Sequence, residues 1–153
     1  MTEEREEMFE HPCFKDGKET RMVRLYRRSH RLYKKNHKRL ARFIRNIIRF
    51  IYTSQIDPAA EIGSPLHFGH GMNIVIGAAK IGNRVDLSHS ITIAAGAEIG
   101  DNFFMGPGAR IIRPVKIGNN VRIGANAVIS KDVPDNTLAI GIPAKYYPLK
   151  ETE

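Results

Sequence analysis

"KIGNRVDLSHSITIAAGAEIGDNFFMGPGARIIRPVKIGNNVRIGANAVIS", the stretch from Lys80 to Ser130, carries a large apolar side chain at every sixth position. These positions are Ile81, Leu87, Ile93, Ile99, Met105, Ile111, Ile117, Ile123 and Ile129. A short fixed period is typical of a solenoid, in which each coil is too small to fold alone and stacks on its neighbours. The same period continues upstream through Ile56, Ile62, Phe68 and Ile74, with one residue inserted between Ile74 and Ile81. We therefore expect a mainly β fold built from stacked coils.

Charge divides the chain before the repeat begins. Residues 1–20 carry three basic and seven acidic side chains, residues 21–54 carry twelve basic and no acidic ones, and residues 55–153 carry nine of each. The basic segment lacks Gly and Pro, and its basic and apolar residues recur at helical spacing, which predicts one or two amphipathic helices. The expected organisation is an acidic segment 1–20, a basic helical region 21–54, a solenoid over 55–135, and a C-terminal turn and tail over 136–153.

Composition narrows the function classes. Cys13 is the only cysteine, so one chain can form neither a disulfide framework nor a cysteine-rich zinc site. The N-terminus lacks the apolar core of a signal peptide, and no run of eighteen apolar residues occurs. We expect a cytoplasmic protein. The basic segment has no recognisable nucleic-acid module beside it, so we expect no nucleic-acid partner.

Two longer motifs point to a family. The segment "IGANAVISKDVPDNTLAIGIPAKYY", from Ile123 to Tyr147, joins the last full coil to a Gly-x-Pro-Ala turn. In this it resembles the hexapeptide-repeat acyltransferases, whose hexads wind a left-handed parallel β-helix with three hexads per coil. The resemblance implies about four to five coils here. The run from Leu25 to Gly77 is similar to serine acetyltransferases and to the related capsule and exopolysaccharide acetyltransferases.

The resemblance implies roles for histidines in "LHFGHGMNIVIG", Leu66 to Gly77. In those enzymes, a histidine just before a "GIVI"-type run is the general base that removes the proton from the acceptor hydroxyl, and His70 occupies that place. An imidazole that titrates near neutrality suits this task. By hexad register, His89 lies one coil plus the inserted residue beyond His70, so we expect the two rings to stack at one corner. His67 matches no base of the family and is expected to be structural.

The resemblance also implies the cofactor and the assembly. In the family, acetyl-CoA lies lengthwise between two subunits of a trimer and contacts small residues and backbone. The corresponding cofactor candidates are Ala95, Pro107, Ala125, Ser130 and Lys131. Backbone N–H groups that face the thioester carbonyl would stabilise the oxyanion. We expect a homotrimer with active sites between subunits and no metal.

Departures from the family pattern bear on the acceptor. Serine acetyltransferases have an aspartate immediately before the catalytic histidine and another one coil earlier, whereas the matching residues here are Gly69 and Gln55. A histidine-bearing glycine-rich loop of those enzymes is also missing. These differences favour a cell-envelope or exopolysaccharide sugar as acceptor, free, nucleotide-linked or lipid-linked, and predict that L-serine is a poor one. Gln55, His89 or a backbone carbonyl remain alternatives for orienting His70.

Three other interpretations stay open. L-serine O-acetylation is the first alternative to sugar acetylation. A non-enzymatic solenoid or a γ-carbonic-anhydrase-like protein is the second, although the usual three histidine ligands with a pair four residues apart are not found in the repeat. The third concerns location: residues 21–51 combine a basic stripe with apolar positions, which predicts peripheral contact with an anionic membrane near lipid-linked sugars.

Overall fold

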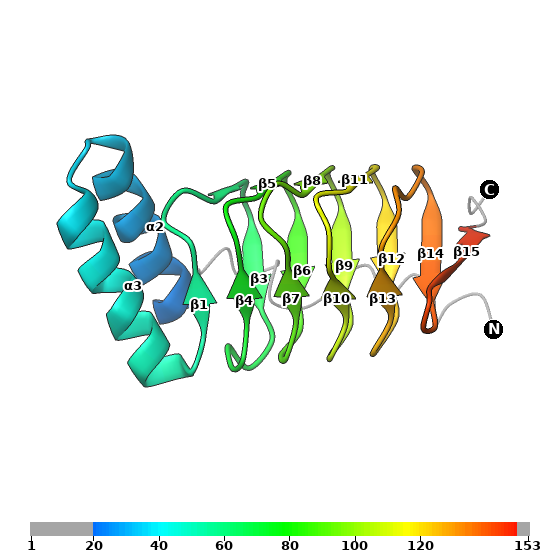
Figure 1. The fold of residues 1–153 in the computed structure, drawn as a ribbon, viewed down its shortest axis with the longest axis horizontal. Helices are drawn as coiled ribbons and strands as arrows, with labels where there is room; N and C mark the ends of the chain where they lie inside the picture. Colours follow the sequence, from blue (N-terminus) through cyan, green and yellow to red (C-terminus); the bar gives the residue numbers. More distant parts are fainter. Residues whose placement is uncertain (1–19, 150–153) are drawn as a thin grey trace.

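The computed structural model describes residues 20–149, which form two helices followed by a β-solenoid of about five turns (Figure 1). The predicted acidic segment, with Cys13, lies outside the described residues except for Thr20. The helices are α2 (Arg21–Lys34) and α3 (Lys38–Tyr52). The strands are β1 (Gln55–Ile56), β2 (Glu61–Ile62), β3 (Leu66–Phe68), β4 (Val75–Ile76), β5 (Lys80–Ile81), β6 (Val85–Leu87), β7 (Thr92–Ile93), β8 (Glu98–Ile99), β9 (Phe103–Met105), β10 (Arg110–Ile111), β11 (Lys116–Ile117), β12 (Val121–Ile123), β13 (Val128–Ile129), β14 (Thr137–Ile140) and β15 (Lys145–Pro148).

The strands assemble into three sheets that form the faces of a prism. Sheet A contains β1, β4, β7, β10 and β13, sheet B contains β2, β5, β8 and β11, and sheet C contains β3, β6, β9, β12, β14 and β15. Each coil contributes one strand to each sheet in turn, and successive coils pair in parallel. This arrangement confirms the predicted hexapeptide-repeat solenoid and is consistent with a left-handed β-helix.

The core of the prism is the apolar column predicted from the hexads. All nine hexad positions from Ile81 to Ile129 are buried. Full burial of an Ile or Leu side chain stabilises a fold by roughly 1.5–3 kcal/mol, so this column contributes strongly to the stability of the solenoid. The small side chains four positions later, such as Val85 and Ala97, are also buried and let the coils stack closely.

The position of the irregularity in the repeat differs from the prediction. Ile56 pairs with Ile76 rather than with Ile74. The turn after Phe68 is therefore lengthened, and the segment from Ile76 to Ile81 is shortened. A hexad count alone could not place the insertion, because both Ile74 and Ile76 are buried.

Two helices cover the N-terminal end of the prism (Figure 1). The Thr20 side chain accepts a hydrogen bond from the Val23 N–H at 3.4 Å, which caps the start of α2. Residues 35–37 form the turn between α2 and α3. Thr53 ends α3 in a left-handed conformation with φ 49°. Met22, Tyr26 and Ile48 belong to the same buried core as the coils, so the helices and the solenoid pack as one unit.

The C-terminal part differs from the predicted turn and tail. The Gly-x-Pro-Ala turn is present over Gly141–Ala144, but it joins two strands. Strand β14 adds to sheet C in parallel with β12, and β15 pairs with β14 in antiparallel fashion. Strands β14 and β15 have only four residues each, and their buried and exposed residues do not continue the six-residue period, so sequence periodicity could not predict them.

Stacked polar side chains hold one corner of the prism. The Asp101 carboxylate accepts a hydrogen bond from the Asn83 backbone N–H at 2.7 Å, and the Asn119 side chain accepts one from the Asp101 N–H at 2.8 Å. Asp135 continues the series by accepting from the Asn119 N–H at 2.6 Å. Each side chain satisfies a backbone donor of the preceding coil, which fixes the register between coils.

Candidate active site

The predicted histidine pair lies at the corner between sheets C and A. His70 and His89 each lie two residues after the last residue of a strand of sheet C. Those last residues, Phe68 and Leu87, pair in adjacent coils, so the two histidines are neighbours. The ring centroids of His70 and His89 are 5.6 Å apart, and the ring planes meet at 68°. The expected proximity of the two rings is confirmed, and the geometry is edge-to-face rather than parallel stacking. Their catalytic roles stay predictions.

The histidine turn has an unusual backbone. His70, Gly71 and Asn73 have φ angles of 59°, 62° and 54°, in the left-handed region. That region is uncommon for residues other than glycine, although Asn and His adopt it more often than most. The His70 side chain is exposed, so its ring is accessible to a substrate.

Gln55 and Gly69 border this turn on opposite sides. The Gln55 backbone N–H donates to the carbonyl of Ile74 at 2.7 Å, and its side chain is exposed on sheet A. Among the described residues, no hydrogen bond joins Gln55 to His70. A Cβ added at Gly69 would lie 3.6 Å from the Ser88 Cα and 3.8 Å from the Leu87 carbonyl oxygen. These are ordinary contacts, so space does not exclude a side chain at position 69.

The structure separates the cofactor candidates into two groups. Pro107 and Ala125 each lie two residues after a strand of sheet C, so they continue the corner occupied by the histidines. The Gly108 N–H donates to the His89 carbonyl and the Asn126 N–H to the Pro107 carbonyl, which links these turns in order along the prism.

The remaining candidates lie elsewhere. Ala95, Ser130 and Lys131 follow strands β7 and β13 of sheet A, and therefore lie at the corner between sheets A and B. Ala95 occupies the same position of its hexad as Pro107 and Ala125, two residues after a strand, but it lies at a different corner because alternate hexads of one coil lie on different faces. Sheet A separates the two groups. A cofactor that contacts both within one chain would have to cross that sheet.

Sequence reasoning missed a contact between a histidine and an aspartate, His67 and Asp86. The Nδ1 atom of His67 lies 2.8 Å from Oδ1 of Asp86, and Asp86 is only 8% exposed. The two residues are register partners on β3 and β6, so the pair lies on the face of sheet C rather than at the corner. The separation that relates His70 to His89 also relates His67 to Asp86 and would have revealed it. The bond gives His67 a structural partner, in agreement with its expected structural role.

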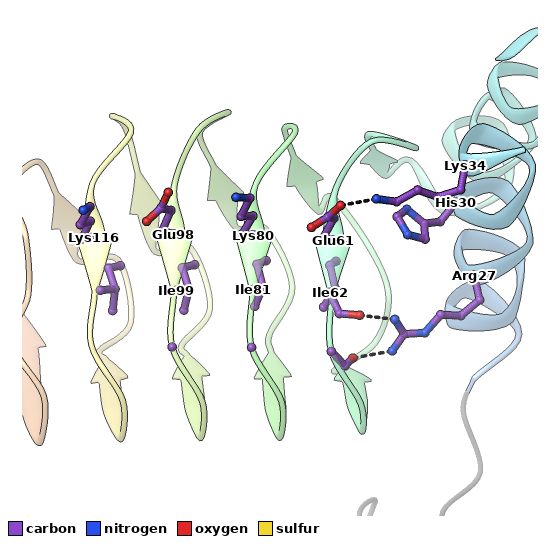
Figure 2. A pocket seen from close by; sticks show the side chains of 14 residues that line it. Arg27, His30, Lys34, Glu61, Ile62, Lys80, Ile81, Glu98, Ile99 and Lys116 are labelled. Atoms are coloured by element: carbon purple, nitrogen blue, oxygen red, sulfur yellow. Dashed lines mark hydrogen bonds and ion pairs between the residues drawn. The ribbon is translucent and has the colours of Figure 1, made fainter. Parts of the chain in front are cut away.

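One groove lies away from the His70–His89 pair. It has a volume of about 890 Å³ and runs along sheet B beside α2 (Figure 2). Its floor presents Glu61, Lys80, Glu98 and Lys116 in register on successive strands, so unlike charges alternate along it. Lys34 forms an ion pair with Glu61, and this bond and its charge lower the pKa of the Glu61 carboxyl. Sheet B is the face opposite the corner of sheets C and A, so the groove is not part of the histidine site.

Metal ligands do not gather in the described chain. Within residues 20–149, no three His, Cys, Asp or Glu side chains come close enough to hold a metal ion.

Comparison with known proteins gives consistent matches. The family model described as "Bacterial transferase hexapeptide (six repeats)" matches residues 96–131. A serine acetyltransferase of Helicobacter pylori strain J99 is 36% identical over 129 residues, which cover 78% of this chain and 75% of that protein.

Solved structures show the same similarity. A Neisseria gonorrhoeae serine acetyltransferase is matched with a TM-score of 0.81 at 32% identity over 86% of this chain. A serine acetyltransferase in complex with CoA is matched with a TM-score of 0.79 at 32% identity over 82% of this chain. The chain spans about half of each solved protein, 54% and 55% respectively. These matches give no support to the capsule and exopolysaccharide branch of the resemblance.

Proposed function

Because the chain belongs to the hexapeptide-repeat acyltransferases of the serine acetyltransferase type, we propose that it transfers an acetyl group from acetyl-CoA to a hydroxyl group. The observation that supports this most directly is the exposed His70 ring against His89 at one corner of the prism. The similarity to a protein solved with CoA supports the choice of donor.

The mechanism follows from the chemistry of a neutral imidazole. A ring nitrogen of His70 accepts the proton of the acceptor hydroxyl while the hydroxyl oxygen attacks the thioester carbonyl. The tetrahedral intermediate collapses with loss of the CoA thiolate, which takes the proton from the imidazolium. The products are an O-acetyl ester and free CoA. His89 contacts the His70 ring edge-to-face and restricts its orientation.

L-serine is the acceptor that the relatives favour. The three relatives described above are named serine acetyltransferases, which reverses the order of the two acceptors favoured by sequence reasoning. At Gly69 the chain lacks the carboxylate that its resemblance to serine acetyltransferases implies for the serine ammonium group. Losing a hydrogen bond to a charged group costs about 1.5–3 kcal/mol, so we expect a high KM for L-serine.

A sugar hydroxyl is the second candidate. The observation that favours it is the pair Gly69 and Gln55, which are both uncharged where carboxylates are expected for an amino-acid substrate. A neutral acceptor needs no ion pair at either position.

The acceptor is identified by measuring thiol release from acetyl-CoA with L-serine, free sugars, nucleotide sugars and lipid-linked sugars. If L-serine is the acceptor, it gives the highest kcat/KM, and Gly69→Asp lowers its KM at least about tenfold, since Gly69 has room for a side chain. Gly69→Asn is the matched control without the charge. Faster turnover of a sugar would establish the second candidate, and no transfer to any acceptor would contradict acetyl transfer itself.

We propose that the protein is a homotrimer with its sites between subunits, as hexapeptide-repeat acetyltransferases of this type typically are. In this arrangement, the corner between sheets A and B of one subunit, with Ser130 and Lys131, would lie beside the His70 corner of the neighbouring subunit. Light scattering checks the assembly, since the trimer mass is three times 17.3 kDa.

Helix α3 supports a proposal about location. Leu40, Phe43, Phe50 and Ile51 are 50%, 61%, 90% and 61% exposed, and their separations of three, seven, eight and eleven residues place them on one side of the helix. The surrounding segment 21–54 has twelve basic and no acidic residues. A second copy of the same face would bring like charges together, whereas an anionic lipid surface complements them. No helix within residues 20–149 is long and apolar enough to cross a membrane, so the contact proposed is peripheral.

Vesicle co-sedimentation tests this contact. The protein is expected to bind vesicles that contain anionic lipid, to bind neutral vesicles weakly, and to dissociate as salt rises. The double variant Phe43→Ser, Phe50→Ser should lose at least about tenfold in affinity, while the control Ile142→Ser, which changes a residue 72% exposed at the other end of the solenoid, should not. Equal binding to both vesicle types, binding to neither, or concentration-dependent self-association through α3 would contradict the proposal.

A further inference from the structure

The turn that carries His70 cannot be held by the coil ladder alone. Between Phe68 and Ile76, which occupy equivalent inward positions of β3 and β4, the chain has more residues than at the next turn of the same corner, from Leu87 to Ile93. The Ser90 N–H donates to the Met72 carbonyl at 3.0 Å, which ties one side of the turn to the second coil. The other side faces the N-terminal end of the prism, where residues 20–149 contain no earlier turn of this corner to pair with it.

The residues at the end of α3 supply the missing partners. Ser54, which is fully buried, accepts a hydrogen bond from the Ile74 N–H at 3.1 Å. Its Oγ also lies 2.9 Å from the Tyr52 carbonyl oxygen and 3.3 Å from the Gly71 carbonyl oxygen, either of which accepts its proton. One hydroxyl therefore spans the turn from the residue after His70 to the first residue that rejoins the coil.

Two further contacts attach the same turn to the helices. The Thr53 hydroxyl lies 3.0 Å from the Asn73 side-chain oxygen and 2.7 Å from the Tyr52 carbonyl oxygen, either of which accepts its proton. A Cβ added at Gly71 would lie 3.3 Å from Sδ of Met22 and 3.9 Å from the Tyr52 ring, so the turn packs closely on both α2 and α3.

We propose that Ser54 is a positioning residue, which holds the turn from Gly69 to Ile74 so that the His70 ring meets the ring of His89 and faces the acceptor. The inference rests on the proposed role of His70 as general base. The helices would then also serve the reaction, by holding the His70 turn, independently of the proposed contact of α3 with a membrane. Ser54 itself is buried and touches no substrate.

The matched variants are Ser54→Ala and Ser29→Ala. Both remove a fully or almost fully buried hydroxyl from the helical region, since Ser29 is 1% exposed and donates to the Ala41 carbonyl at 2.8 Å within the helix pair. Ser54→Ala should lower kcat at least about tenfold and leave the KM for acetyl-CoA within about twofold. Ser29→Ala should lower the melting temperature to a similar degree without changing kcat. In the NMR spectrum, the imidazole signals of His70 and His89 should shift in Ser54→Ala and not in Ser29→Ala.

Asn73→Gly provides a second route if Ser54→Ala fails to fold. Glycine keeps the left-handed conformation of φ 54° and removes the bond from Thr53. We expect an intermediate loss of kcat and a smaller shift of the same imidazole signals. An active wild-type enzyme that His70→Ala inactivates, but whose kcat and imidazole signals are unchanged in Ser54→Ala and Asn73→Gly, would overturn the positioning role alone. Absence of transfer by the wild-type protein would instead overturn the proposed function.

Discussion

At the scale of single residues, His70 is the side chain on which the proposed chemistry depends. Its ring is exposed, contacts His89 and lies on a turn with a left-handed backbone. His70→Ala should reduce acetyl transfer at least about a hundredfold and leave folding and acetyl-CoA binding intact, because the base acts only in the chemical step. Thiol release and calorimetric titration with acetyl-CoA measure the two quantities. His89→Ala should have a smaller effect, and His67→Ala, whose partner is Asp86 on sheet C, should keep its kcat. Turnover near the wild-type rate by folded His70→Ala would remove His70 from the mechanism.

At the scale of elements, Tyr26 joins α2 to the first coil. Its buried hydroxyl donates to the Ala60 carbonyl at 2.7 Å. Tyr26→Phe leaves that buried carbonyl without this donor and should lower the free energy of unfolding by about 1–3 kcal/mol. Burial, opposed by the charge of Arg27, raises the pKa of Tyr26 to about 12. The folded state therefore holds this proton more tightly than the unfolded state, in which the phenol has a pKa of about 10. The stabilisation is fully present below about pH 10 and is lost as pH rises toward 12.

Urea unfolding of the wild type and of Tyr26→Phe at pH 8, 10 and 11 measures this dependence. The difference between the two proteins should be largest at pH 8 and decrease at pH 11. A difference that stays constant or grows over this range would show that the phenol is not held neutral by the fold.

At the scale of the whole molecule, close approach of the coils makes some glycines indispensable and others replaceable. A Cβ at Gly82 would lie 2.7 Å from the Gly100 carbonyl carbon and oxygen, which are backbone atoms of the next coil. Gly82→Ala must therefore push two coils apart and should lower the free energy of unfolding by about 2 kcal/mol or more. Gly69→Ala is the matched control, because its Cβ meets only ordinary contacts, and its effect should stay within about 0.5 kcal/mol. Denaturant unfolding compares them, and equal stability of the two variants would contradict the stacking argument.

The solenoid could be predicted from the sequence because its core depends on a strict six-residue period. Every hexad position from Ile81 to Ile129 is buried, as that period requires. The sequence also placed His70 beside His89, because residues at equivalent hexad positions meet in adjacent coils. The lengthened turn after Phe68 could not be located from the sequence. Ile74 and Ile76 are both apolar and both buried, so the hexad period alone does not show which of them pairs with Ile56. The contacts of Ser54 were out of reach for the same reason, since they depend on that turn. The strand β15 was missed because its pairing depends on tertiary contact rather than on a repeat.

The antiparallel direction of β15 has a consequence for how copies of this molecule meet. A parallel coil is a template for the next one, so an uncovered last coil would accept the first coil of another chain and extend into a fibre. On sheet C, β15 lies over β14 in the opposite direction and ends with Pro148, which has no N–H to donate. At the opposite end, α3 lies against β1. Deleting β15 should therefore expose the edge of β14, and because α3 still covers β1, two exposed ends can meet only each other, which gives end-to-end pairs rather than fibres.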